Sequence, residues 1–354
     1  MPKGKRAWIV TTPGVVCLLL AIVWSMASSI EVAQGAPRAE WSIATEYPAD
    51  TVSGQAAEDF ARQLNEAGRD KVHAIPHFAD KRGVAAVQER ISRQPFGVLF
   101  AGDLASRDAI LALSIRPYEV NSIAEAREMS RLAKPAYRAA LAHRDLVLLA
   151  VIPWPPTGIW SRTAIGSPSD LIGMRIRTYD ESSRRVMQML GADVVFLPIQ
   201  EALAQIKAGG VDAVMSSGDG AAGRAYAEVL PYFTALGYAY PVSFLVANRH
   251  FLDGLPEHQR AVIFAAGLQT EQHAWERLPE RVRHNYEGMA ASGVTVRDPA
   301  PRELLDAISR AAQDDRRDSV LSDYETAQML AQFRARQPRV CRACAAIADT
   351  EVTR

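Results

Sequence analysis

Two arginines on one face of a predicted strand are the residues whose types and spacing best suit binding chemistry. The stretch GMRIRTY, residues 173 to 179, alternates as a strand does, so Arg175, Arg177 and Tyr179 share one face. The planar fork of a guanidinium grips a carboxylate through two parallel hydrogen bonds. Arg177 stands near the C-terminal end of this strand, beyond which open α/β sheets bind ligands. The pattern favours a carboxylate ligand for Arg177 and pairing with nearby acids in solvent for Arg175.

Signatures of the common catalytic and metal sites are absent from the sequence. It contains no G-x-S-x-G elbow, no H-E-x-x-H helix and no Walker loop, and its seven histidines lack the spacing of metal ligands. The glycine-rich stretch from Ser216 to Gly223 follows a predicted strand and could hold an anion with its backbone N–H groups, or simply line a cleft. We expect neither a metal nor a cofactor.

Four acidic residues that could be catalytic carboxylates have ordinary structural explanations. Asp180, Glu181 and Glu201 stand near predicted helix starts, where a carboxylate complements the helix dipole, and Asp212 begins a short strand. No acid–base pair for catalysis stands out. The sequence therefore favours a binding protein over an enzyme.

The charge of the chain is balanced. Forty basic residues offset forty acidic ones among 354, and neither sign forms a long run. Proteins that bind nucleic acid or anionic membrane surfaces carry basic patches, so neither partner is indicated. A chain of this length can bury a large core and is expected to divide into two compact units.

The first 35 residues have the pattern of a secretory signal. A basic start, MPKGKR, precedes the apolar run from Val15 to Trp24, and small residues around Gly35 suit cleavage after that position. The alternative is a retained membrane anchor, because no charged residue lies between Ala7 and Ile30. Cleavage is favoured because threonine, proline and glycine dilute this run. We therefore expect export to the periplasm.

Cys341 and Cys344 form a C-x-x-C pair near the C-terminus. Such a pair can be a redox site, half of a metal site or a local disulfide. No second pair completes a zinc site, and the preceding stretch is unlike the strand that leads into a redox motif. We expect an incidental pair or a small structural disulfide within a loose tail, residues 337 to 354.

Strands and helices alternate through most of the chain. Two β-α-β-α-β units are predicted, over residues 40 to 102 and 174 to 217, with a proline-rich joint at residues 153 to 158 between them. A longer helix from about Ile123 to His143 leads to a continuous apolar strand before the joint. The pattern predicts an α/β protein with two lobes.

Beyond the second unit the sequence predicts one more strand and then mainly helix. The strand covers residues 240 to 251. A helix opened by Pro256 is expected to run to about Arg277, where Pro279 kinks or restarts it. Polar helix follows from Pro301 to about residue 336.

Several motifs resemble the substrate-binding subunits of TRAP (tripartite ATP-independent periplasmic) transporters, the DctP-like family. The run DLIGMRIRTY fits the pattern D-L-x-G-x-K/R-x-R, and LGADVVFLPIQEALAQIKAGGVDAVMSSG fits the segments that follow it. One detail departs from the pattern, because Glu201 stands one residue before Ala202 and Leu203. The stretch VANRHFLDGLPEHQRAVI is similar to the family's passage from a strand into a helix.

The resemblance implies a periplasmic binding protein whose two lobes close over an organic acid, with a long helix braced across both. It places Arg177 on the arginine that binds the ligand carboxylate, and it implies membrane permease subunits as partners. Lobe I is then expected over residues 36–153 and about 237–262. Lobe II, with bracing helices, is expected over residues 154–236 and about 263–336.

Departures from the family pattern suggest the character of the pocket. Trp154 and Trp160 stand where many members have a further polar contact, and Ser216 and Ser217 replace an Asn-Pro. The pocket is therefore expected to suit an acid with an apolar, keto or aromatic body, although indoles near prolines are also ordinary core residues. The remaining contacts are expected from Ser216, Ser217, Tyr179 and, in the first lobe, Glu46 or Tyr47.

Two other functions fit the same residues. The protein could be a ligand-sensing module that presents its closed form to a receptor, or an exported enzyme that acts on an organic acid. Genes for two membrane subunits nearby would favour transport, and turnover of a ligand would favour an enzyme.

Overall fold

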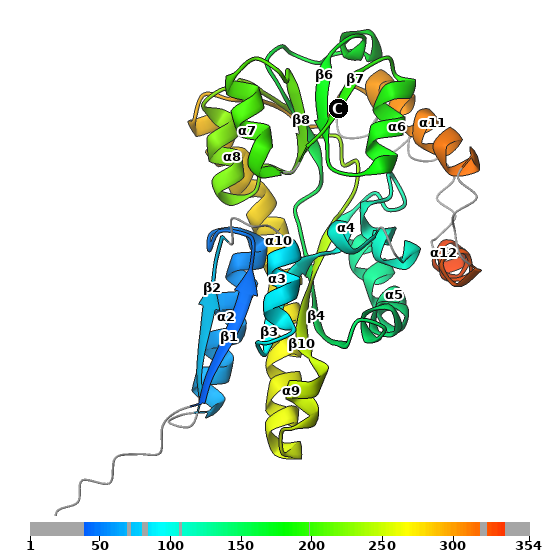
Figure 1. Cartoon of the computed structure of the whole chain (residues 1–354). Coiled ribbons are helices and arrows are strands. Elements are labelled where there is room, and N and C mark those ends of the chain that lie inside the picture. The colour runs from blue at the N-terminus through cyan, green and yellow to red at the C-terminus, as the bar shows by residue number, and fades with distance from the viewer. Residues whose placement is uncertain are drawn as a thin grey trace, which may run out of the picture. The chain divides into compact units, whose positions relative to one another are not determined.

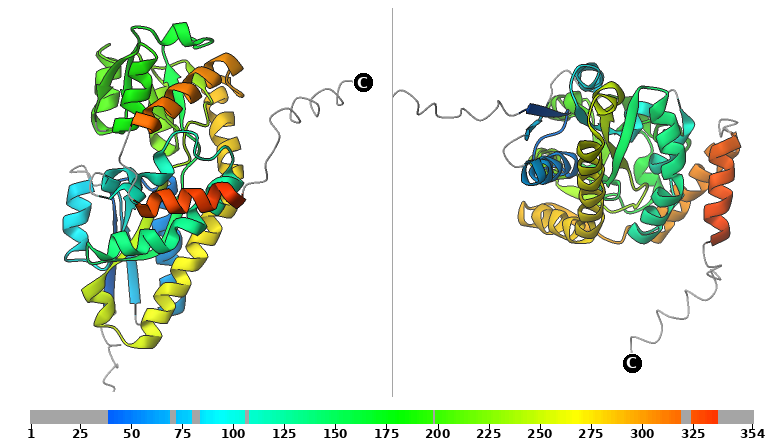
Figure 2. Two further views of the ribbon diagram at one scale, coloured as in Figure 1. Left: turned by 90° about the vertical axis from the view of Figure 1, so that its right-hand side faces the viewer. Right: turned by 90° about the horizontal axis from the view of Figure 1, so that it is seen from below.

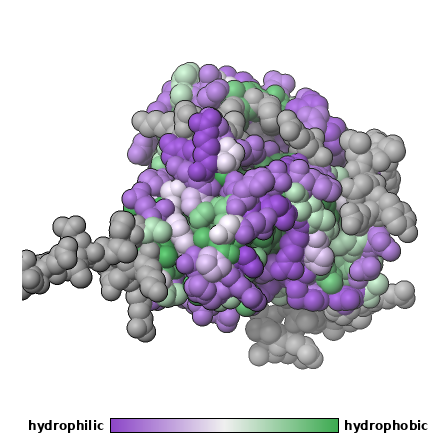
Figure 3. Space-filling view, turned by 60° about the horizontal axis from the view of Figure 1, so that its bottom comes forward, coloured by the Kyte–Doolittle hydropathy of each residue, from purple (hydrophilic) through white to green (hydrophobic). Residues whose placement is uncertain are grey.

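The computed structural model describes residues 39–68, 72–79, 84–105, 108–197, 199–318 and 324–336. The predicted signal, residues 1 to 35, and the predicted tail with its two cysteines lie outside these residues. The described residues from Glu40 onward belong to one compact unit that contains two β-sheets (Figure 1). None of the described helices is both long and apolar enough to span a bilayer. Hydrophilic residues cover most of the face drawn in Figure 3, and apolar ones gather in a smaller area near its centre.

The first sheet mixes parallel and antiparallel strands in the order β2-β1-β3-β10-β4. β1 runs parallel to β3, whereas β10 is antiparallel to both β3 and β4. The strands are β1 Ala39–Thr45, β2 Val72–His77, β3 Phe96–Phe100, β4 Leu146–Pro153 and β10 Val242–Asn248. Every residue of β10 is buried, as the apolar run in that part of the sequence requires.

Helices cover both faces of this sheet. Because successive strand residues face opposite sides, Phe244 and Val246 pack with α5, while Leu245 and Ala247 pack with α2 and α10. Ser122 caps α5 by accepting a hydrogen bond from the backbone N–H of Glu125 at 3.1 Å. We call this sheet and its helices the first lobe. Its helices are α2 Val52–Gly68, α3 Val84–Ile91, α4 Ala101–Leu104, η2 Ala109–Ile115, α5 Ile123–Ala142 and α9 Arg249–Asp253.

The second sheet has the order β11-β9-β5-β8-β6-β7. β6 is parallel to both β7 and β8, and β5 is antiparallel to β8 and β9. Its strands are β5 Gly158–Ser161, β6 Arg175–Thr178, β7 Asp193–Phe196, β8 Ala213–Ser216, β9 Tyr232–Thr234 and β11 Thr295–Arg297. We call this sheet and its helices the second lobe. The helices are η3 Pro168–Leu171, α6 Glu181–Met189, α7 Ile199–Lys207, α8 Gly220–Ala227 and α11 Arg302–Asp318.

The long helix α10, Glu257–Ala291, contacts elements of both lobes. It packs on β4 and α2 of the first lobe and on α8 and β11 of the second (Figure 1). The predicted end near Arg277 is wrong, because the helix continues through Pro279. A proline inside a helix costs about 3 kcal/mol. Buried side chains on either side of it, Leu278 and Met289 among them, anchor the helix to the core and offset that cost.

The chain passes between the two sheets in segments that pair with one another. Residues 154 to 157 lead from β4 into β5, and residues 235 to 241 lead from β9 back to β10. Thr157 joins the two segments: its N–H donates to the carbonyl of Ala239 at 2.9 Å, and its carbonyl accepts from the N–H of Tyr238 at 3.0 Å. The predicted α/β class with two lobes, a hinge and a bridging helix is confirmed.

Candidate ligand-binding site

Arg177 lies on β6, in the interior of the second sheet between β7 and β8 (Figure 1). Its side chain is 5% exposed, and its Nε donates to the backbone carbonyl of Leu197 at 2.8 Å. Among the described residues, no carboxylate forms an ion pair with it. Burial lowers the pKa of Arg177 because the charged form loses its hydration. Within the described part of the chain, the charge of Asp103 acts on Arg177 from a distance, but no ion pair offsets the burial of its charge.

Arg175, two residues earlier, has the opposite environment. It is exposed, and its guanidinium makes a two-pronged contact with Asp212: Nε lies 2.8 Å from Oδ2 and Nη2 lies 2.7 Å from Oδ1. This pair lowers the pKa of Asp212. The predicted pairing of Arg175 with a nearby acid in solvent is confirmed, and Asp212 has a structural role.

Three tyrosines, from both lobes, lie close enough to Arg177 to interact with its charge. Tyr179 follows β6, Tyr226 lies in α8, and Tyr47 follows β1 of the first lobe; each interacts electrostatically with the guanidinium. Burial raises the pKa of all three phenols, so they stay neutral at physiological pH. The Tyr226 hydroxyl is buried and has no hydrogen-bond partner among the described residues. Neutral phenols beside a buried cation can donate hydrogen bonds to an anion that the cation attracts.

Two carboxyl groups of the first lobe belong to the same electrostatic cluster. Asp103, in α4 just after β3, is exposed to solvent, yet desolvation by the surrounding protein raises its pKa. A hydrogen bond with Glu46 and the charge of Arg177 act in the opposite direction. The charges of Glu46 and Asp103 also help to raise the pKa of Tyr47. The cluster therefore combines the Arg177 cation of the second lobe with the carboxyl acceptors of Glu46 and Asp103 in the first lobe.

The profile of the bacterial extracellular solute-binding proteins, family 7 (DctP), matches residues 43–317. The chain belongs to this family. A curated relative, a solute-binding protein of Albidiferax ferrireducens, is 27% identical over 182 residues; the match spans 49% of this chain and 54% of that protein.

Solved structures share the fold. DctP7, a Bordetella pertussis extracytoplasmic solute receptor that binds pyroglutamic acid, aligns with a TM-score of 0.78 at 22% identity and covers 84% of this chain and 99% of its own. A marine metagenome TRAP solute-binding protein specific for pyroglutamate aligns with a TM-score of 0.77 at 19% identity, over 85% of this chain and 100% of its own. At these identities the likeness establishes the fold of this DctP-family chain.

The indole rings of Trp154 and Trp160 each pack against a tyrosine of the cluster. Trp154 is 8% exposed, donates from Nε1 to Ser243 Oγ at 2.9 Å, and meets the ring of Tyr47 with a centroid distance of 4.8 Å. Trp160 is fully buried and packs 5.7 Å from the ring of Tyr226. Both indoles thus support a tyrosine of the cluster, and their contact with a ligand stays a prediction.

The loop that begins with Ser216 and Ser217 is shaped around Trp160. Both serines are half-buried, and Ser216 Oγ accepts from the N–H of Gly218 at 3.1 Å. Gly218 has a φ of +67°, and a Cβ there would lie 2.4 Å from the Trp160 ring, so only glycine fits. The next residue, Asp219, turns its carboxylate away from the loop and accepts hydrogen bonds from the N–H of Val52 in α2 and from Nη2 of Arg281 in α10.

The other acidic residues considered as catalytic candidates lie at the starts of α6 and α7. Asp180 caps α6 by accepting from the N–H of Ser183 at 2.6 Å, Glu181 pairs with Arg184, and Glu201 is exposed in the first turn of α7. The described residues contain no group of three or more metal-ligating side chains. The structure thus gives these acids the helix-start positions that the sequence predicted.

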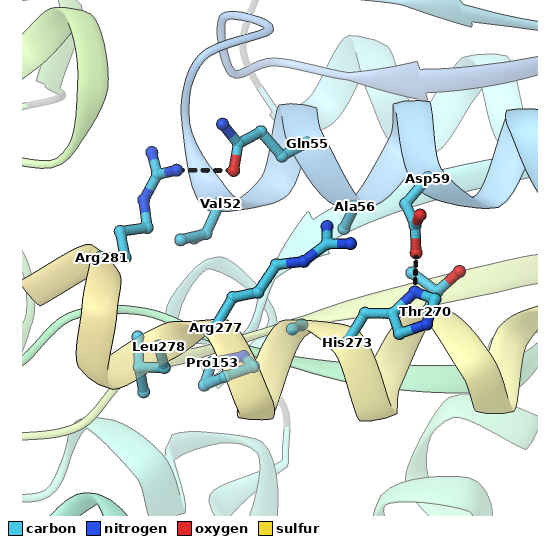
Figure 4. Close-up of a pocket in the computed structure, with 11 residues that line it drawn as sticks. Val52, Gln55, Ala56, Asp59, Pro153, Thr270, His273, Arg277, Leu278 and Arg281 are labelled. Atoms are coloured by element: carbon cyan, nitrogen blue, oxygen red, sulfur yellow. Dashed lines mark hydrogen bonds and ion pairs between the residues drawn. The ribbon is translucent and has the colours of Figure 1, made fainter.

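A small cavity between α2 and α10 has a volume of about 40 Å³. Asp59 and His273 meet across it, with Oδ2 and Nδ1 2.8 Å apart, and Arg277 extends from α10 toward α2 (Figure 4). This volume has room for a few water molecules and not for an organic acid. The cavity is therefore too small for the expected ligand, and its lining residues do not belong to the cluster around Arg177.

Sequence reasoning missed Asp103 and Tyr226. Asp103 follows the C-terminal end of β3, so the rule that singled out Arg177 would also have found it. Tyr226 carries no such signal, because its position in α8 looks like that of an ordinary core aromatic. The folded structure packs its ring on Trp160 and places it close enough to Arg177 for the two groups to interact electrostatically.

Proposed function

We propose that the chain is the substrate-binding subunit of a TRAP transporter, which captures a small organic acid and delivers it to membrane permease subunits. The observation that carries this proposal is the buried guanidinium of Arg177, with one hydrogen bond to a backbone carbonyl and no carboxylate partner among the described residues. A buried charge is costly unless a counter-charge meets it. A ligand carboxylate would supply that charge to the two Nη atoms.

The groups around Arg177 favour an acid that also carries a hydrogen-bond donor. Glu46 and Asp103 offer acceptors, while the adjoining rings of Tyr47 and Trp154 offer apolar surface. Pyroglutamate combines a carboxylate, a ring N–H and a small apolar ring, and three of the structural neighbours bind it. Pyroglutamate is therefore the first ligand to test, followed by keto and aromatic acids.

Closure of the lobes would couple capture to delivery. Tyr47, Glu46 and Asp103 belong to the first lobe and Arg177 to the second, so an acid between them contacts both lobes only when they approach. A ligand shifts an equilibrium by the difference in its affinity for the two states. Residues 1 to 35 would first direct export of the chain and then be removed. The permease subunits would recognise the closed form that holds the ligand.

The test is a binding panel on protein purified after export. Calorimetry and thermal shift would compare pyroglutamate, keto acids, phenylacetate, galacturonate and succinate on wild type, Arg177→Gln and Arg175→Gln. We expect one class to bind, with Arg177→Gln weakening affinity by about 30- to 5000-fold and Arg175→Gln changing it little. Ligand recovered afterwards is expected to be chemically unchanged.

Equal responses of the two variants would overturn the role of Arg177 and with it the proposed carboxylate capture. Tightest binding of succinate or another dicarboxylate would refute the proposed substrate class. Conversion of the ligand would identify an enzyme instead.

A further inference from the structure

An open pocket of about 530 Å³ lies at the C-terminal helices, and neither Arg177 nor the three tyrosines near it are among its lining residues. Arg116 and Glu119 line it from the segment between η2 and α5, and Arg316 lines it from the last turns of α11. Arg334 comes from α12, Tyr324–Arg336, which packs along α5 of the first lobe (Figure 2). Three separate parts of the chain therefore meet around it.

The three arginines converge on one carboxylate. Glu119 has a side chain only 3% exposed; its Oε2 lies 2.9 Å from Arg334 Nη2, and its Oε1 lies 3.4 Å from Arg116 Nε. Arg316 Nη1 is 4.0 Å from Oε1 and donates to the backbone carbonyl of Pro117. One carboxylate has too few acceptor sites for all the N–H donors of three guanidinium groups.

The charge of the described residues that line the pocket does not balance. A guanidinium stays protonated in proteins, so three of them against one carboxylate leave an excess of two positive charges. Arg116 and Arg316 are each only 20% exposed, which limits screening by water. Burial, with the charges of Arg116 and Arg334, lowers the pKa of Arg316. The charges of Arg116 and Arg334 therefore act against the charge of Arg316.

We propose that this pocket binds a small oxyanion with two negative charges, of the phosphate type, held by Arg116, Arg316 and Arg334. Guanidinium forks match the geometry of phosphate oxygens, and a dianion would cancel the excess charge. The anion would join the segment before α5 to α11 and α12, and so would stabilise the packing of α11 and α12 with the first lobe. This site is independent of the carboxylate site proposed above.

The alternative is that the three arginines only hold the side chain of Glu119 in place and bind no anion. A titration with inorganic phosphate distinguishes this alternative from the proposed anion site. Protein purified after export would be titrated at constant ionic strength against chloride, with thermal shift and ³¹P line broadening as readouts. Arg316→Gln removes one fork of the pocket. Arg283→Gln, an exposed arginine on α10 that pairs with Glu280, is the matched control.

We expect phosphate, but not chloride, to stabilise wild type and Arg283→Gln, with an affinity at least about 10-fold weaker in Arg316→Gln. Glu119→Gln removes the competing carboxylate and is expected to bind phosphate several-fold more tightly. Absence of a phosphate effect in wild type, or equal effects in Arg316→Gln and Arg283→Gln, would overturn the proposal.

Arg177→Gln distinguishes this site from the carboxylate site. Its phosphate response is expected to equal that of wild type. A response lost in Arg177→Gln but kept in Arg316→Gln would mean that phosphate binds beside β6, and the pocket at α11 and α12 would then carry no anion site. That result would leave the capture of an organic acid by Arg177 untouched.

Discussion

Arg281 donates two hydrogen bonds to Asp219, from Nε at 2.6 Å and from Nη2 at 3.0 Å, and the Asp219 side chain has no exposed surface. Asp219 lies in the loop between β8 and α8, whereas Arg281 lies in α10. The same carboxylate also accepts from the N–H of Val52, at the start of α2, at 2.9 Å. Figure 4 shows Arg281 reaching from α10 toward Gln55 of α2. One buried ion pair thus ties the second lobe to the long helix and to the first lobe.

Asp219→Asn is expected to destabilise the protein strongly. The substitution leaves the half-buried Arg281 without its counter-charge, and breaking one side of a buried pair costs about 3–5 kcal/mol. Urea unfolding would measure the loss in the free energy of unfolding. Asp212→Asn breaks the exposed pair with Arg175 and is the control, with an expected cost of about 1 kcal/mol or less. An equal loss in the free energy of unfolding for the two variants would mean that the pair between Asp219 and Arg281 stabilises the fold no more than an exposed pair does.

Arg177→Met is expected to abolish ligand binding and to raise the stability of the ligand-free protein. Without ligand the substitution removes a buried charge that no described carboxylate neutralises, so the free energy of unfolding should rise by about 1 kcal/mol or more. Binding of an organic acid should be lost in the same variant. Chemical unfolding without ligand, followed by calorimetry, checks both parts. A clear loss of ligand-free stability would show that Arg177 is satisfied by the protein itself.

Tyr226→Phe is expected to leave stability unchanged or slightly raised. It removes a buried hydroxyl that has no hydrogen-bond partner among the described residues and keeps the ring that packs on Trp160. If the hydroxyl donates to a ligand bound at Arg177, affinity should fall by about 10-fold or more. Thermal unfolding and calorimetry would measure the two effects. Unchanged affinity would exclude the hydroxyl from the binding site.

Asp180→Asn is expected to change how stability depends on pH. Burial raises the pKa of Asp180 from 3.8 to about 6, against the opposing hydrogen bonds of Ser183 and the charge of Arg185. The folded state therefore holds this proton more tightly than the unfolded state. The resulting destabilisation is about 3 kcal/mol above pH 6 and fades as the pH falls toward 4.

Asparagine keeps the cap on Ser183 without the charge. The variant should therefore exceed wild type in stability at pH 7.5, and the difference should shrink toward zero near pH 4. Urea unfolding of both proteins across this range gives the difference directly. A difference that does not vary with pH would contradict the raised pKa.

Local patterns in the sequence were enough to predict much of the fold. The β-α-β-α-β unit predicted over residues 40 to 102 is present as β1, α2, β2, α3 and β3, and Ala57, Phe60, Ala61 and Leu64 of α2 are buried. The continuous apolar runs became the buried strands β4 and β10. Local patterns failed at Pro279, because burial of α10 against both lobes outweighs the intrinsic cost of a proline.

The sequence alone determined the α/β class, the two lobes, the family motifs and the common strand parity of Arg175 and Arg177. Parity could not separate the two arginines, since both side chains leave the same face of β6. Position along the strand favoured an acid partner in solvent for Arg175 and a ligand for Arg177. Only the tertiary structure identified the partner of Arg175 as Asp212 and buried Arg177 near tyrosines from both lobes. The reason is physical: burial and electrostatics depend on which distant segments pack together. Asp103, Tyr226 and the arginines around Glu119 come together only when the chain folds.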